Sequence, residues 1–69
     1  MSFIQIKKLS SDVWEATAHF DEACVVGDKK YWLFKAEGLD ELDAVQNVKE
    51  YCRKKGAVLG PEPIQVMES

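Results

Sequence analysis

The sequence predicts a small α+β fold, a two-layer sandwich in which one amphipathic helix packs on a three- to four-stranded antiparallel sheet. Residues 39–56 carry apolar side chains at the spacing of a helix, and residues 3–7, 13–20 and 31–34 have strand-forming patterns. The chain has 69 residues, which suffices for one hydrophobic core. We therefore expect a single domain over residues 1–69 with the element order β-β-β-α and an optional last strand.

The first two strands differ in the strength of their pattern. Residues 3–7 alternate well enough for a short strand that ends at a Ser-Ser-Asp turn. In residues 13–20 successive side chains would point to opposite faces of a strand, which places Ala16 and Ala18 on one face between Trp14 and Phe20. Small side chains in mid-strand leave room for a helix, so we expect the helix to lie over these alanines, with the two aromatic residues closing the groove. The opposite face carries Val13, Glu15, Thr17 and His19.

The segment between residues 21 and 30 has the weakest pattern. Residues 23–26 fit either a short edge strand or an ordered loop, and Gly27 with Asp28 is a turn signal. Residues 31–34 are apolar on both faces, which favours a central strand or a covered outer face. If the even residues of this strand face the helix, Tyr31 and Leu33 lie on the outer face.

The helix has signals at both ends. Asp40 is a good N-cap, and Asp43 stands at the third helical position, where a capping box has its acid. Gly56 can adopt the left-handed turn that ends a helix. The apolar side that we expect to face the sheet consists of Leu42, Val45, Val48 and Cys52, with Ala44 and Tyr51 at its edge.

The chain after the helix contains a bend and a short strand. Residues 60–63 read Gly-Pro-Glu-Pro, which cannot continue regular structure after residues 57–59. Residues 64–67 can form a last strand, which we expect at an edge of the sheet.

Composition restricts the environment and the class of partner. The formal net charge is −3 and the sequence pI about 5.0, whereas proteins that bind phosphate backbones are usually basic. No apolar run approaches the ~20 residues of a membrane helix, and the start of the chain does not resemble a signal peptide. We expect a cytoplasmic protein, with Cys24 and Cys52 as reduced thiols; one structural disulfide is the alternative.

The residues that could carry chemistry are few. His19, Asp21 and Cys24 lie close in sequence and could in principle activate a thiolate, but no glycine-rich or nucleophile-elbow element accompanies them. A zinc site needs about four ligands, usually with short paired spacings that this chain lacks. We therefore expect no enzyme activity, no metal and no cofactor.

Two surfaces remain as candidates for function. Aromatic and branched side chains on an outer sheet face could anchor another protein, and the chain would then be a small inhibitor, regulator or subunit that binds through a sheet face or an edge strand. These candidates are Val13, Tyr31 and Leu33. The alternative is that residues 21–30 or the C-terminal tail fold over this face, and a second copy of the chain could also cover it. The alternative is an RNA-binding rim made of Lys7, Lys8, Lys29, Lys30, Arg53, Lys54 and Lys55.

Overall fold

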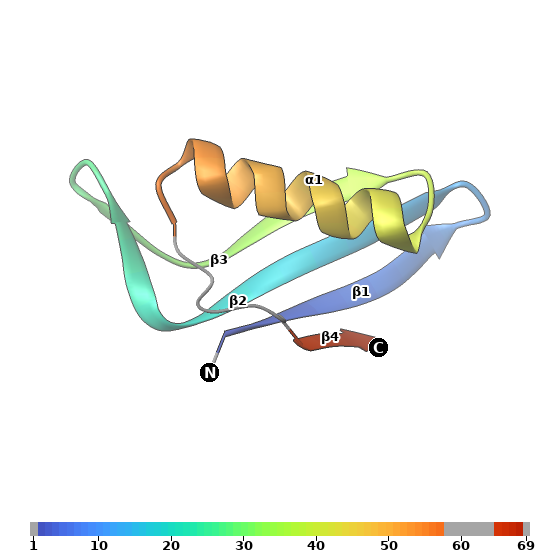
Figure 1. Cartoon of the computed structure of the whole chain (residues 1–69), viewed down its shortest axis with the longest axis horizontal. Helices are drawn as coiled ribbons and strands as arrows, with labels where there is room; N and C mark the ends of the chain where they lie inside the picture. The colour runs from blue at the N-terminus through green and yellow to red at the C-terminus, as the bar shows by residue number, and fades with distance from the viewer. Residues whose placement is uncertain (1, 58–64, 69) are drawn as a thin grey trace.

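The computed structural model describes residues 2–57 and 65–68. One helix lies across one face of a four-stranded sheet, and the other face of the sheet carries no second layer among these residues (Figure 1). The predicted α+β sandwich and its element order are confirmed. The elements are β1 (Phe3–Ser10), β2 (Val13–Val26), β3 (Lys29–Gly38), α1 (Glu41–Lys54) and β4 (Gln65–Glu68).

The sheet has the strand order β3-β2-β1-β4 and is mixed rather than wholly antiparallel. The pairs β1–β2 and β2–β3 are antiparallel, whereas β4 runs parallel to β1, with Phe3 opposite Gln65. The parallel pair agrees with the direction of α1, which runs back toward the end of the sheet where β1 begins (Figure 1). The last strand is at an edge, as expected. The predicted bend at residues 60–63 and the first residue of that strand, Ile64, lie outside the described residues.

Strand β2 is longer than the sequence pattern suggested. It continues to Val26, and Val26 pairs with Lys29, so that Gly27 and Asp28 form a two-residue hairpin loop. Gly27 has a φ of 64°, a left-handed conformation typical of such loops. Since β1 begins at Phe3 opposite His19, β2 beyond that point pairs with β3 alone. We call this two-stranded extension, residues 20–32, the hairpin arm.

The core lies between the helix and the sheet. Ala16 and Ala18 are fully buried, and Trp14 and Phe20 are half-buried against the core at either end of these alanines, so the predicted groove is confirmed. The helix packs mainly on β3 and β2 and less on β1. The buried apolar residues are Ile4, Ile6, Ala16, Ala18, Phe34, Ala44, Val45, Val48 and Cys52.

Both helix ends form as the sequence predicts. The Asp40 side chain accepts a hydrogen bond from the backbone N–H of Asp43 at 2.7 Å, and the Asp43 carboxylate accepts one from the N–H of Leu39 at 2.9 Å. This reciprocal arrangement satisfies two amides at the start of the helix. Gly56 has a φ of 78°, and its N–H donates to the carbonyl of Arg53. Gly56 therefore ends the helix in the left-handed conformation.

The buried side of the helix differs from the predicted one at Leu42. This side chain is 67% exposed, whereas Ala44, expected at the edge, is fully buried. At about 100° per residue, Leu42 lies about 90° from the centre of the stripe formed by Val45, Val48 and Cys52. The helix is rotated so that the small Ala44 meets the sheet, and Leu42 turns outward.

Candidate functional site

The sequence-based prediction that Tyr31 lies on the outer face of the sheet was wrong. Its ring lies 5.2 Å from that of Phe34 and packs against the core, whereas Trp32, expected to face the helix, is 61% exposed. The physical reason is a shift of register between β2 and β3. His19 pairs with Leu33 and Cys24 with Tyr31, so residues 20–23 of β2 stand opposite Trp32 alone. Alternation along β3 is broken at this irregularity, as is usual at bulges.

Tyr31 instead belongs to an aromatic cluster at the end of the core. Phe34 is its centre, with the Phe20 ring at 5.5 Å and the Tyr51 ring at 5.1 Å. Such rings gain from edge-to-face and tilted packing in addition to the burial of their surface. The cluster connects the hairpin arm, β3 and the last turns of α1, so Tyr31 serves the core of the domain.

The other two candidates for protein binding do not form one patch. Leu33 is 40% exposed and pairs with His19, while Val13 is half-buried at the start of β2 opposite Ser10. Their positions are six residues apart along β2, a distance of about 20 Å. The polar side chains of Glu15 and Thr17 stand between them. The outer face therefore does not have the apolar centre that the sequence suggested.

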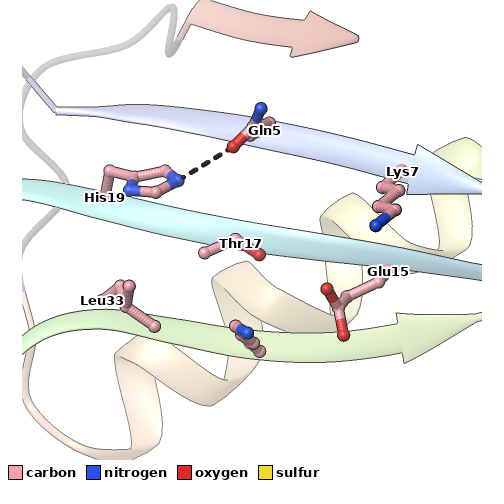
Figure 2. Close-up of a pocket in the computed structure, with 7 residues that line it drawn as sticks. Gln5, Lys7, Glu15, Thr17, His19 and Leu33 are labelled. Carbon is pink, nitrogen blue, oxygen red and sulfur yellow. Dashed lines mark hydrogen bonds between the residues drawn. The ribbon is translucent and has the colours of Figure 1, made fainter. Parts of the chain in front are cut away.

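The uncovered face of the sheet is predominantly polar. Figure 2 shows it from the side opposite α1, which lies behind the strands. His19 Nε2 lies 3.2 Å from Gln5 Oε1, and the Phe3 ring stacks on the His19 ring at 4.6 Å. The face contains an open hollow of about 420 Å³ with lysines and a glutamate in its lining. The lining residues are Gln5, Lys7, Glu15, Thr17, His19, Leu33 and Lys35.

The structure separates the histidine and the cysteine of the group that could have activated a thiolate. His19 lies on the uncovered face beside Gln5, whereas Cys24 packs against the core beneath the helix. The imidazole and the thiol thus lie on opposite sides of the sheet. Within residues 2–57 and 65–68, no group of three or more His, Cys, Asp or Glu side chains is arranged to hold a metal ion.

Both cysteines are free thiols on the core side of the sheet. Cys52 is fully buried in α1, and Cys24 is half-buried in the hairpin arm. Burial raises the pKa of the Cys52 thiol from 9.0 to about 11, and the nearby Cys24 raises it further to a smaller extent. At neutral pH Cys52 is therefore a protonated, apolar core residue.

The lysines and the arginine do not form a single rim. Lys29 and Lys30 at the tip of the hairpin arm lie at the same end of the long axis as the C-terminus of α1 (Figure 1). Lys7 and Lys8 lie at the other end, because Lys8 pairs with Trp14, and Trp14 pairs with Gly38 just before the helix begins. The prediction of one continuous basic rim was therefore wrong for Lys7 and Lys8.

Several of these charges already have partners. Arg53 forms an ion pair with Glu50, which raises the pKa of the guanidinium and lowers that of the carboxyl. The ammonium group of Lys8 lies 5.8 Å from the centre of the Trp14 ring, and that of Lys55 lies 5.7 Å from the Tyr51 ring. These contacts are cation–π interactions that hold the lysines along the surface of the domain.

The edge of β3 is the feature that the sequence did not reveal. The apolar run at residues 31–34 favoured a central strand, but β3 is at the edge, and within the part of the chain that the structure describes no strand pairs with its outer side. Trp32 and Leu33 are both exposed near the middle of this ten-residue strand. At its end, the Asn47 side chain donates a hydrogen bond to the carbonyl of Glu37 at 2.8 Å.

Comparison with known proteins gives no match: no protein-family model, no curated protein and no solved structure is significantly similar to this chain. In the described ranges, no helix is long and apolar enough to span a bilayer. The arrangement of the residues themselves is therefore the basis for any statement about function.

Proposed function

We propose that this protein is a non-catalytic protein-binding module and that the edge of β3 is its binding surface. A strand at an edge presents a row of backbone N–H and C=O groups that can pair with another strand. Addition of a strand to such an edge is a common mode of peptide and protein recognition. The observation that carries the proposal is the open ten-residue strand β3 with Trp32 and Leu33 exposed at its middle.

Exposed aromatic side chains support the edge over the uncovered face. Trp32 is 61% exposed, and large aromatic residues are enriched among those that dominate binding energy. Leu33 also borders the hollow on the uncovered face, but the other side chains that line this hollow are polar or charged, among them Lys7, Glu15 and Lys35. Such a surface is well solvated, and binding there would require the removal of water from charged groups.

The proposal is tested by affinity purification from the source cells with a tagged wild-type chain and two variants. Leu33→Lys places a charge on the edge strand, and Leu42→Lys places the same charge on an exposed leucine of the helix. We expect proteins captured by the wild type to be captured by Leu42→Lys and lost with Leu33→Lys, while circular dichroism shows both variants folded. If Leu33→Lys captures the same proteins in the same amounts, the edge of β3 is not the binding surface.

A further inference from the structure

We propose that Cys24 and Cys52 form a reversible disulfide that fixes the hairpin arm to the last turns of α1. In the reduced protein both are free thiols on the core side of the sheet, one in the arm and one in the helix. They are the two cysteines of the chain, so an internal disulfide has a single possible pairing. The proposal does not depend on what binds the edge of β3.

The hairpin arm brings Cys24 to the helix. Figure 1 shows the arm turning out of the line of β2 toward the side of the sheet that α1 covers. Cys24 pairs with Tyr31, and both side chains pack against the core. The Tyr31 ring packs on the Phe34 ring, which in turn packs on Tyr51, the residue before Cys52. Both thiols therefore border the same aromatic cluster.

The two thiols also affect each other electrostatically. Burial makes the largest contribution to the raised pKa of the Cys52 thiol, and Cys24 raises this pKa further. A titratable group has such an effect only on a near neighbour. The electrostatic effect and the shared packing place the two thiols together.

The base of the arm provides a point at which the arm can bend. A disulfide requires two Cα atoms within about 4.4–6.8 Å of each other. Residues 20–23 stand opposite Trp32 alone, so regular pairing is interrupted where the arm joins the rest of the sheet. Beyond this irregularity β2 pairs only with β3. A bend here moves Cys24 relative to α1 and leaves the other strand pairs intact.

The reaction is an exchange with a small disulfide such as oxidised glutathione, which is the oxidant. Cys24, the more exposed thiol, loses its proton and attacks one sulfur of the small disulfide, whose S–S bond breaks and releases one half as a thiolate. Cys52 then loses its proton and attacks the Cys24 sulfur, which releases the other half. Two protein thiols are oxidised, the small disulfide is reduced to two thiols, and the two protons pass to the released thiolates.

The bond closes the loop of chain from residue 24 to residue 52. It restricts the unfolded chain and so raises the stability of the fold when the native geometry accepts it. Because linkage is reciprocal, the folded state must favour the disulfide by the same factor by which the disulfide favours folding. The folded chain should therefore form the bond more readily than the unfolded chain.

The experiment is equilibration of the purified chain with mixtures of oxidised and reduced glutathione, in buffer and in denaturing urea. Acid quenching and intact mass spectrometry separate the reduced chain, its glutathione adducts and the internal disulfide, which is lighter than the reduced chain by two hydrogen atoms. We expect the equilibrium constant for the internal disulfide to be at least roughly tenfold larger in buffer than in urea. We also expect the oxidised chain to unfold at a temperature higher by roughly 10 °C or more.

Two alanine variants test the order of the steps. Cys52→Ala should stop at the glutathione adduct of Cys24. Cys24→Ala should remain unmodified while folded, because Cys52 is fully buried. Circular dichroism shows whether each variant is folded, and in urea both variants should take up glutathione equally.

Three results would overturn the proposal. An equilibrium constant that is no larger in buffer than in urea would mean that the fold does not bring the two thiols together. A folded wild-type chain that accumulates only the Cys24 adduct, or disulfide-linked dimers, would exclude the internal bond. Rapid modification of Cys52 in folded Cys24→Ala would contradict the order in which the thiols react.

Discussion

Gly38 and Ala44 bring the backbone of β3 and the backbone of α1 into direct contact. A Cβ atom built on Gly38 would lie 2.7 Å from the Cα of Ala44 and still closer to its nitrogen, so no side chain fits at position 38. Ala44 is the fully buried residue of the first turn of the helix. This contact fixes how closely the helix approaches the sheet where the helix begins.

Replacement of Gly38 by alanine should lower the free energy of unfolding by about 1–3 kcal/mol, because the added methyl group must displace backbone atoms. Urea denaturation followed by circular dichroism measures the change. Gly56→Ala is the comparison, since position 56 has open space around it but a φ of 78°. We expect that variant to lose about 1 kcal/mol through backbone strain alone. Equal effects would contradict the close approach at Gly38.

Loss of the helix cap should be detected at Asp40. Asp40→Ala removes the acceptor for the N–H of Asp43 and should cost about 1 kcal/mol of stability. Asp40→Asn keeps an acceptor at the same position and ranks equally well as an N-cap, so its stability should stay near that of the wild type. Thermal unfolding of the three proteins at one concentration provides the measurement. If the asparagine variant lost as much as the alanine variant, the carboxylate charge rather than the hydrogen bond would be responsible.

The aromatic cluster predicts a sharp contrast between neighbouring residues of β3. Phe34→Ala removes the ring that contacts Phe20, Tyr31 and Tyr51 and should cost about 3–5 kcal/mol. A loss of that size would leave a domain of this length largely unfolded. Trp32→Ala should change stability by less than about 1 kcal/mol, because its side chain is exposed. The two variants are compared by far-ultraviolet circular dichroism, and a severe loss with Trp32→Ala would place that side chain in the core.

The Cys52 thiol should make stability fall at alkaline pH. Its pKa is about 11 in the folded protein and near 9.0 as an isolated thiol, so between these values the unfolded chain loses a proton that the folded chain keeps. The contribution of this thiol to stability is therefore complete below pH 9 and decreases as the pH rises from 9 to 11. Cys52→Ala removes this decrease at the cost of a small cavity, and denaturant midpoints across this pH range measure it. Parallel stability curves for the wild type and Cys52→Ala would contradict the prediction.

Reagent labelling gives an independent check on the two thiols. In the folded protein Cys24, which is half-buried, should react with a thiol reagent before Cys52 does. Under denaturing conditions both should react at similar rates. Equal rates in the native protein would mean that Cys52 is not enclosed by the helix and the sheet.

Local patterns in the sequence predicted the order of the elements, the faces of residues 13–20 and the two ends of the helix. The alanines between Trp14 and Phe20 marked where the helix lies, and Asp40 and Gly56 marked its ends, because each of these signals acts within a few residues. The last strand was predictable in the same way: a strand was predicted at residues 64–67, and β4 occupies Gln65–Glu68. A period of two or of 3.6 residues is a property of the local backbone, so the sequence contains it directly.

The tertiary structure alone decided the features that depend on distant segments. The register shift between β2 and β3 moved Tyr31 into the core and Trp32 to the surface, and the order of the strands left β3 at an edge. The approach of α1 at Gly38 turned Leu42 outward. The distance of Lys7 and Lys8 from the other basic residues likewise followed from how the strands are arranged. Pairing between strands depends on the whole sheet, and one inserted residue reverses every side chain beyond it, so no local pattern could show which apolar residues would be left for a partner.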